Sequence, residues 1–172
     1  MNSNVEIKAR ARNPARLKEL AEKLSETPEE FLRQEDTFFH VPRGRLKLRV
    51  FSPERGELIY YERSDEAGPR PCQYVISKTG APETLKVALA AALGVKGVVR
   101  KTRRLYLAGQ TRIHLDEVEG LGHFLELEFV MQPGQSVEEG LAAVHELLRE
   151  LEVSKEELLD RAYVDLLGAK AP

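Results

Sequence analysis

The alternation of charged and apolar residues is the most regular pattern in this chain. Residues 45–49 are Arg-Leu-Lys-Leu-Arg, so a β-strand here would present three cations on one face and two leucines on the other. The same period of two occurs in residues 4–12, 99–105, 111–116 and 125–129. We therefore predict five strands that are charged on one face and largely apolar on the other.

Turn residues separate a larger set of predicted strands. These strands span about residues 5–11, 34–41, 45–50, 58–64, 73–78, 98–107, 111–118 and 124–131. Residues 42–44 and 53–56 contain Pro and Gly, which is typical of tight turns between paired strands. Because four consecutive strands between residues 34 and 78 are joined by short connections, we expect them to form an antiparallel meander.

Helical periodicity predicts three or four helices. The pair Asn13-Pro14 suits the N-cap and first position of a helix after the first strand. Two further helices are predicted over residues 83–93 and 137–151. Residues 155–167 are expected to begin as a helix and to end in a short extended piece at 163–166.

The apolar faces of these helices and strands predict how the elements pack. Helices bury their stripes against the apolar strand faces, so the charged faces lie on the side away from the helices. In an open sheet those faces would be solvated, whereas in a curled or closed sheet of about eight strands they would surround a polar lumen. We therefore predict an α+β fold, a closed or nearly closed eight-stranded antiparallel β-barrel with helices on its outside. We expect a single domain over residues 1–172 whose C-terminal helical segment, about 137–167, packs on the barrel.

Composition narrows the classes of function. The formal net charge is −2, which argues against a general nucleic-acid binder, since such proteins carry a basic excess. Cys72 is the only cysteine, so neither an intramolecular disulfide nor a Cys-based zinc site is expected. No apolar run approaches the ~20 residues of a membrane span, and Glu6 and Lys8 interrupt any signal-peptide core. We expect a cytoplasmic protein that binds neither nucleic acid nor membrane.

The predicted lumen would hold an unusual concentration of charge. Its cations would be Lys8, Arg10, Arg45, Lys47, Arg49, Arg63, Lys78, Lys101, Arg103 and Arg112, and its acids Glu6, Asp116, Glu126 and Glu128. Unpaired buried charge is costly, so we expect a polyanionic ligand. Arginine and lysine suit phosphate oxygens, and carboxylates beside phosphate suit Mg²⁺ or Mn²⁺. The lumen therefore predicts metal-assisted phosphoryl chemistry.

Familiar catalytic motifs do not offer another explanation. No G-x-x-x-x-G-K-[ST] loop occurs, which excludes a P-loop fold, and no G-x-G-x-x-G follows a strand. The histidines at positions 40, 114, 123 and 145 are scattered, and only His114 lies on a charged strand face.

The order of these motifs resembles the CYTH domain family, the triphosphate tunnel metalloenzymes. The family's N-terminal E-x-E-x-K signature falls on residues 4–8, where Glu6 and Lys8 match and Asn4 replaces the first Glu. The similarity continues through the basic strand at Arg45, Lys47 and Arg49, then Lys78, the K-x-R pair Lys101 and Arg103, Asp116, and the E-x-E pair Glu126 and Glu128. It covers nearly the whole chain.

The resemblance implies a CYTH-like domain that binds a triphosphate and two divalent metal ions, Mg²⁺ or Mn²⁺. It implies metal binding by Glu6, Asp116, Glu126 and Glu128, and phosphate binding by Arg45, Lys47, Arg49, Lys78, Lys101 and Arg103. Arg63 is expected to join the phosphate-binding cations from the same face of its strand. The implied catalytic residues are Glu6 and Lys8. Lys8 would act as general base or would orient the nucleophile.

The reaction itself stays open. Residues 34–39, 44–49 and 120–122 are most similar to the class IV adenylyl cyclase-like branch, which favours conversion of ATP to cyclic AMP and pyrophosphate. A triphosphatase would instead hydrolyse tripolyphosphate, thiamine triphosphate or a nucleoside triphosphate. Asn4 brings no charge to a metal, so a catalytically weak polyphosphate or nucleotide binder is a third hypothesis. The amphipathic helix at 137–151 would also suit a homodimer.

Overall fold

The computed structural model of the protein describes residues 1–65 and 67–170. Its strands are β1 (Asn2–Arg10), β2 (Glu30–Phe39), β3 (Arg45–Ser52), β4 (Arg55–Arg63), β5 (Arg70–Thr79), β6 (Val95–Ala108), β7 (Thr111–Val118), β8 (Gly122–Val130) and β9 (Leu158–Leu159). Its α-helices are α1 (Pro14–Leu24), α2 (Pro82–Leu93), α3 (Val137–Glu150) and α4 (Tyr163–Lys170), and Lys155–Glu157 form a short 3₁₀ helix. Every element predicted before residue 151 is present, with ends that differ by a few residues.

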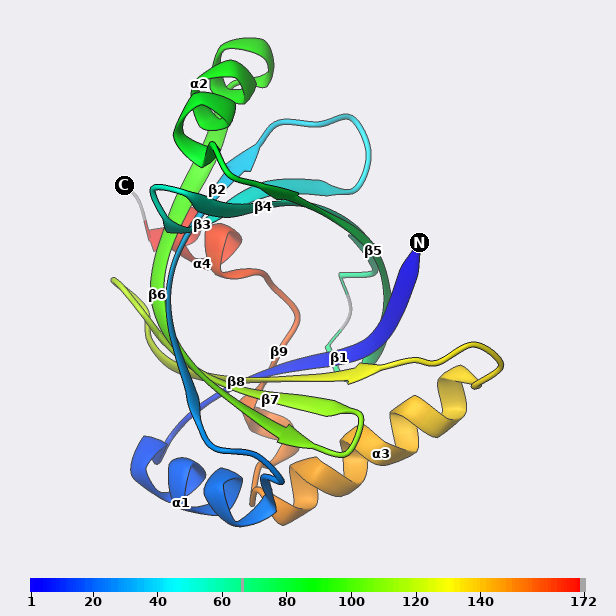
Figure 1. Ribbon diagram of the computed structural model, residues 1–172. Coiled ribbons are helices and arrows are strands. Elements are labelled where there is room, and N and C mark those ends of the chain that lie inside the picture. The colour runs from blue at the N-terminus through cyan, green and yellow to red at the C-terminus, as the bar shows by residue number, and fades with distance from the viewer. Residues whose placement is uncertain (66, 171–172) are drawn as a thin grey trace.

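Strands β1 to β8 close into an antiparallel barrel (Figure 1). Their order is β5-β4-β3-β2-β6-β7-β8-β1, and pairing of β1 with β5 completes the circle. β2 to β5 are the predicted meander, in which each strand pairs with the next. The closed eight-stranded barrel and the α+β class are therefore confirmed.

The period of two determines which side chains enter the barrel. On β1, Asn4, Glu6 and Lys8 line the interior, whereas Val5 and Ile7 lie in the apolar core outside it. The buried members of that core are Val5, Ile7, Ala9, Leu17, Ala21, Tyr106, Ile113, Leu125, Leu127, Phe129, Val144, Leu148 and Leu151. The helices α1 and α3 cover this outer surface (Figure 1). The charged strand faces consequently surround the lumen.

Side-chain caps explain where two of the helices begin. The amide of Arg16 donates to the side chain of Asn13 at 3.1 Å, which confirms the predicted N-cap of α1. At α3, Ser136 and Glu139 form a reciprocal capping box. No helix within residues 1–65 and 67–170 combines the length and the apolar character needed to cross a membrane.

The C-terminal segment departs from its prediction. Lys155–Glu157 are helical as expected, but the extended piece is Leu158–Leu159, and Tyr163–Lys170 form a helix. The expected extended piece at residues 163–166 is therefore wrong. Tyr163 instead packs in a second buried cluster with Phe124, their ring centroids being 5.0 Å apart. This tertiary packing overrides the local preference of aromatic and β-branched residues for strands.

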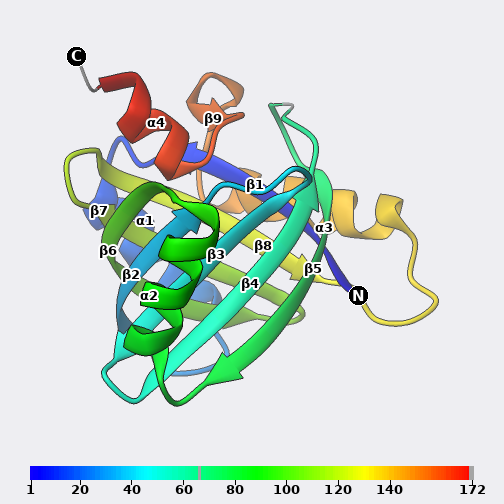
Figure 2. The ribbon, with the colours of Figure 1, turned by 90° about the horizontal axis from the view of Figure 1, so that it is seen from above.

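The edge of β1 explains the position of β9. β1 pairs with β5 only as far as Glu6. Beyond Glu6, this edge of β1 pairs with β9 instead, and Lys8 lies opposite Leu159. The chain then continues from β9 across one end of the barrel to α4 (Figures 1 and 2). This crossing carries Ala162 and Tyr163 into the lining of the barrel interior.

Two helical glycines offer a matched test of how closely α3 packs on the barrel. A Cβ at Gly140 would lie 2.7 Å from Cγ2 of Val5 and 3.1 Å from Cδ1 of Phe129, whereas one at Gly168 in α4 would meet no atom within 4 Å. We expect Gly140→Ala to lower the free energy of unfolding by about 1 kcal/mol, since overpacking exceeds the gain in helix propensity. Gly168→Ala should raise it by about 0.5 kcal/mol. Urea unfolding midpoints measure both, and a stabilised Gly140→Ala would contradict the close approach.

Candidate active site

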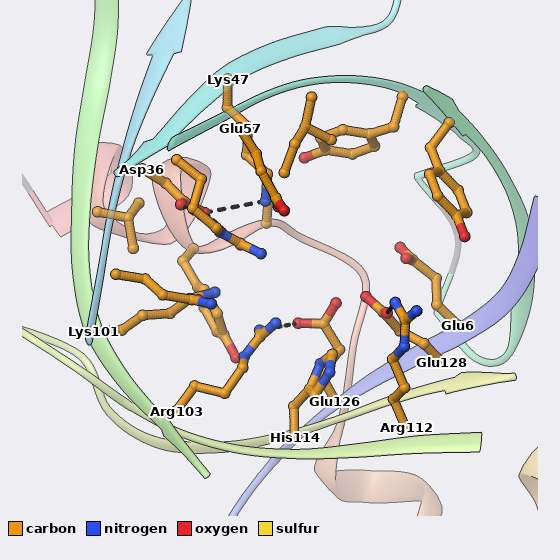
Figure 3. Close-up of a pocket in the computed structure, with 18 of the residues that line it drawn as sticks. Glu6, Asp36, Lys47, Glu57, Lys101, Arg103, Arg112, His114, Glu126 and Glu128 are labelled. Atoms are coloured by element: carbon orange, nitrogen blue, oxygen red, sulfur yellow. Dashed lines mark hydrogen bonds and ion pairs between the residues drawn. The ribbon is translucent and has the colours of Figure 1, made fainter. Parts of the chain in front are cut away.

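A cavity of about 220 Å³ occupies the barrel interior, and β1 to β8 all contribute side chains to it. Its basic lining residues are Lys8, Lys47, Arg49, Arg63, Lys101, Arg103 and Arg112, and its acidic ones are Glu6, Asp36, Glu57, Glu126 and Glu128. The lining thus has seven lysine and arginine side chains and five acidic ones, so its basic residues outnumber its acidic residues. Figure 3 shows Lys101 and Arg103 on one side of the cavity and Glu6 and Glu128 on the other.

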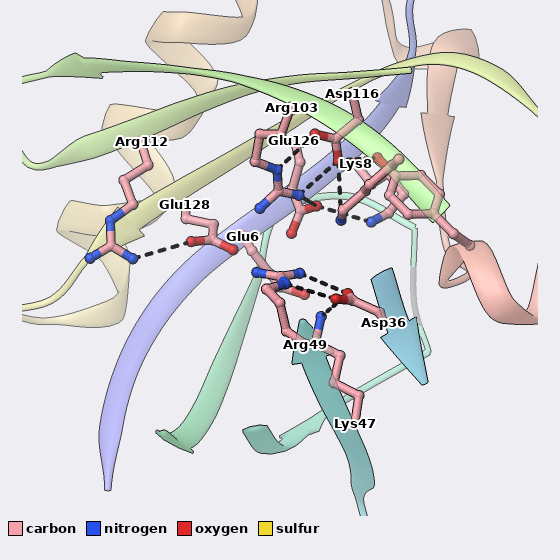
Figure 4. A network of polar contacts seen from close by, with 12 residues as sticks. Glu6, Lys8, Asp36, Lys47, Arg49, Arg103, Arg112, Asp116, Glu126 and Glu128 are labelled. Carbon is pink, nitrogen blue, oxygen red and sulfur yellow. Dashed lines mark hydrogen bonds and ion pairs between the residues drawn. The ribbon is translucent and has the colours of Figure 1, made fainter. Parts of the chain in front are cut away.

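Asp36 organises two of the cations. Arg49 donates from Nε and Nη2 to the two oxygens of Asp36, at 2.8 Å each, and Nζ of Lys47 lies 3.1 Å from Oδ2 (Figure 4). The pairing register places Asp36 directly opposite Arg49. Burial alone would raise the pKa of Asp36, but the charges of Arg49 and Lys47 outweigh it and hold that pKa well below its ordinary value.

Asp116 organises a second pair of cations. Arg103 donates to its two oxygens at 2.7 Å each, the hydroxyl of Tyr163 donates to Oδ2 at 2.9 Å, and Nζ of Lys101 lies 3.5 Å from Oδ2. Burial opposes ionisation, yet Arg103 and Lys101 lower the pKa of Asp116. We call Lys47, Arg49, Lys101 and Arg103 the cationic wall. Each of its arginines is fixed by a bidentate carboxylate.

The lysines of the cationic wall are poised to receive an anion. Burial and the charge of Arg103 lower the pKa of Lys101 to about 7, because together they outweigh the attraction of Asp116. Burial and the charge of Arg49 likewise lower the pKa of Lys47. A phosphate bound beside either amine would favour its charged form.

Glu6, Glu126 and Glu128 form an acidic wall where β1 and β8 pair. Glu6 is opposite Glu128, and Lys8 is opposite Glu126. Glu126 Oε2 accepts from Lys8 at 3.3 Å and from Arg103 at 3.2 Å, whereas Oε1 accepts no hydrogen bond from the described residues. Burial, together with the charges of Glu126 and Glu6, raises the pKa of Glu128 to about 7. The raised pKa of Glu128 reflects the mutual repulsion of the carboxylates in the acidic wall.

The donor set of the acidic wall fits a divalent cation. Ligand atoms of His114, Glu126 and Glu128 all lie within 4.8 Å of one another. The amide oxygen of Asn4 is buried and has no hydrogen-bond partner among the described residues. Carboxylate and amide oxygens are suitable ligands for Mg²⁺ and Mn²⁺. A dication would also relieve the repulsion that raises the pKa of Glu128.

The cavity brings together most of the residues predicted from sequence. Glu6, Lys8, Lys47, Arg49, Arg63, Lys101, Arg103, Glu126 and Glu128 all line it. Four others do not. The first, Arg10, is exposed at the end of β1. Arg45 pairs with Asp165 at 2.7 Å near α4, Lys78 is exposed near the end of β5, and Asp116 lies behind Arg103, with both oxygens engaged. Arg45, Lys78 and Asp116 thus lie apart from the cavity lining, and their roles in phosphate and metal binding stay predictions.

Several cavity residues were missed by the sequence interpretation. Asp36 and Glu57 add negative charge to the lining, so fewer cations are unpaired than the sequence suggested. The signal for Asp36 was present, because Gln34, Asp36 and Phe38 alternate along β2 and share one face. Tyr163 had no such signal, since it reaches the cavity from outside the barrel strands.

The arrangement of these motifs along the chain identifies its family. The family model of the CYTH domain matches residues 2–163. The chain belongs to the CYTH domain family. A candidate adenylate cyclase of Methanocaldococcus jannaschii is 36% identical over 78 residues, which cover 44% of this CYTH chain and 45% of that protein. The match thus spans less than half of the length of this curated relative.

Solved structures share the CYTH fold over nearly their whole length. A protein of Pyrococcus horikoshii aligns with a TM-score of 0.81 and 25% identity, over 95% of this chain and 98% of that one. A candidate adenylate cyclase of Vibrio parahaemolyticus aligns with a TM-score of 0.76 and 19% identity, over 96% and 97%, which shows the fold alone. CYTH proteins are metal-dependent and process triphosphates, as adenylyl cyclase-like enzymes or as triphosphatases.

Proposed function

We propose that this chain is a divalent-metal-dependent enzyme that binds ATP in the barrel and converts it to cyclic AMP and pyrophosphate. The observation that carries the proposal is the pairing of two walls in one cavity, cationic on β3 and β6 and acidic on β1 and β8. A triphosphate needs the first wall, and the metal ion that accompanies it needs the second. The name of the Methanocaldococcus jannaschii relative supports the cyclase-like reaction.

The cationic wall would hold the phosphates with little rearrangement. Asp36 and Asp116 fix Arg49 and Arg103 in bidentate pairs, so their remaining N–H groups are already oriented. Lys101 would gain a proton when phosphate binds, because its pKa in the free protein is about 7. Donors fixed in this way need no further reorganisation as the charge on the phosphates changes during the reaction.

The acidic wall would hold the metal. Glu6, Glu126 and Glu128 supply the charge and the Asn4 amide supplies a neutral oxygen. A metal bound here would neutralise phosphate charge and orient the reacting groups. Lys8 donates to Glu126, and its ammonium lies 4.0 Å from the centroid of the Tyr163 ring. We assign Lys8 the role of orienting the phosphate or the nucleophile from this fixed position.

Hydrolysis of the triphosphate is the second candidate reaction. Lys8 is held by a hydrogen bond to Glu126 and by the ring of Tyr163, which fix its position beside the acidic wall. Attack by water on the terminal phosphate would use the same two walls. Asn4, which adds no charge, favours a third candidate, a protein that binds the triphosphate and turns it over weakly.

One assay separates these candidates. The protein is incubated with ATP or with tripolyphosphate in Mg²⁺ or Mn²⁺, and cyclic AMP, pyrophosphate and orthophosphate are measured. Cyclic AMP and pyrophosphate without orthophosphate would support the cyclase. Orthophosphate without cyclic AMP would identify a triphosphatase instead of a cyclase. Binding of the triphosphate without any of these products would identify a binding protein.

The lowered pKa of Lys101 predicts how the affinity for a triphosphate depends on pH. Its pKa of about 7 in the free protein should rise when a polyanion binds, so binding takes up a proton above that pH. The affinity for tripolyphosphate without metal is therefore expected to be highest below about pH 7 and to fall by up to about tenfold per pH unit above it. In Lys101→Arg the charge is permanent, so the fall should be shallower.

Isothermal titration calorimetry of both proteins between about pH 6 and 9 measures this difference. Because the same ligand titrates in both experiments, its own protonation cancels in the comparison. Equal pH dependence in the wild type and in Lys101→Arg would contradict proton uptake by Lys101.

A further inference from the structure

The imidazole of His114 is a buried group that the phosphate chemistry above does not use. Its side chain lines the cavity from β7, and the residue is only 4% exposed. Nδ1 is buried and has no hydrogen-bond partner among the described residues. Most buried ring nitrogens in proteins are hydrogen-bonded, so an unpartnered one at the edge of a cavity needs an explanation.

The position of His114 places this imidazole beside the acidic wall. Register pairing sets His114 directly opposite Glu126, and Glu128 follows two residues later on the same face of β8 (Figure 3). The ligand atoms of these three side chains lie within 4.8 Å of one another. Two donors at about 2.1 Å from a single ion are at most about 4.2 Å apart, so small side-chain adjustments would allow all three to bind one ion.

We propose that His114 is a nitrogen ligand of the metal site and that, together with Glu126 and Glu128, it makes this site prefer a first-row transition ion such as Mn²⁺ to Mg²⁺. The inference rests on the proposed function only in placing a metal ion at the acidic wall. It adds a ligand outside the E-x-E motif and predicts which class of metal the site selects.

The chemistry of the ligands supports this selection. An imidazole nitrogen binds first-row transition ions, weakly for Mn²⁺ and more strongly for Ni²⁺ and Zn²⁺, whereas Mg²⁺ strongly prefers oxygen ligands in an octahedral arrangement. Nδ1 of His114 has no hydrogen-bond partner among the described residues, and Oε2 of its cross-strand neighbour Glu126 is already engaged by Lys8 and Arg103.

Pulsed electron paramagnetic resonance of the Mn²⁺-loaded protein, without triphosphate, tests the proposal directly. A nitrogen hyperfine coupling is expected in the wild type, and it should disappear in His114→Gln. It should persist in the control His145→Gln, since His145 lies exposed on α3, away from the barrel lining. The wild-type spectrum tests the ligand even where a variant folds poorly.

Calorimetry then measures the selectivity. His114→Gln should weaken Mn²⁺ binding by about tenfold or more and Mg²⁺ binding by less than about threefold. Mn²⁺ binding without nitrogen coupling, or equal losses for both ions, would overturn the proposal and leave the proposed enzymatic function standing. Turnover of a triphosphate that needs no divalent ion would instead refute the proposed function, and the two failures are thus distinguishable.

Discussion

Glu126→Gln is expected to lower metal-dependent turnover of the triphosphate by at least about 100-fold, with metal-free binding of tripolyphosphate retained. Glu126 is the point at which the two walls meet, since its Oε2 contacts both Lys8 and Arg103. Burial would raise its pKa, but Lys8 and Arg103 outweigh burial and hold that pKa well below its ordinary value, so the carboxylate is charged. Glutamine preserves its shape and removes the charge a metal ion requires.

The binding arm of this experiment distinguishes a metal role from a structural one. Removing a negative charge from the cavity should leave tripolyphosphate affinity unchanged or slightly higher, because the cationic wall is intact. Glu35→Gln is the matched control, since Glu35 pairs with Lys86 and Arg100 on the outside of the barrel. Unchanged turnover in Glu126→Gln would exclude a metal role for this residue.

Strand periodicity predicted the barrel and most of its lining because it reports which face a side chain occupies. On β3, Lys47 and Arg49 follow the alternation of the sequence into the cavity, and on β6 Lys101 and Arg103 do the same. The closed barrel followed from the same faces, since apolar helices had to cover the outer one. This part of the site depends only on local sequence.

Periodicity does not report how deep along the barrel a side chain lies. Lys78 follows Cys72, Tyr74 and Ile76 on β5 at the same two-residue interval, but it lies past the lined part of the strand and is exposed. Arg45 is likewise at the first position of β3, where the acid of α4, Asp165, reaches it. Strand tilt and the ends of neighbouring strands set this depth, and both are tertiary properties.

The contacts of Asp116 could not be predicted for a related reason. Its position on β7 suits a metal ligand, but its oxygens are engaged by Arg103 from the neighbouring strand and by Tyr163. Tyr163 arrives from a segment that was expected to be extended and is a helix. Of these two partners, Tyr163 comes from outside the sheet, and such a contact has no signature in the local pattern.

Asp116→Asn is expected to lower the free energy of unfolding by about 3–5 kcal/mol at neutral pH, because it leaves a buried guanidinium without its counter-charge. Asp116 is 2% exposed, and Arg103 has one other acidic contact, Glu126 at 3.2 Å, within the described part of the chain. Tyr163→Phe removes only the hydroxyl that donates to Asp116, so it should cost about 1 kcal/mol. Urea denaturation of both variants measures the difference.

Tripolyphosphate should restore part of this loss, since the anion supplies charge that Arg103 and Lys101 no longer receive from residue 116. The effect of pH has a definite sign. The pKa of Asp116 is lower in the folded protein than in the unfolded chain, so its stabilisation is present above the unfolded value of about 4 and is lost as the pH falls through the folded pKa. The gap in stability between wild type and Asp116→Asn should therefore be constant near neutral pH and narrow in acid. A gap that is no larger than that of Tyr163→Phe, or that widens in acid, would mean that Asp116 is not the counter-ion that holds the cationic wall in place.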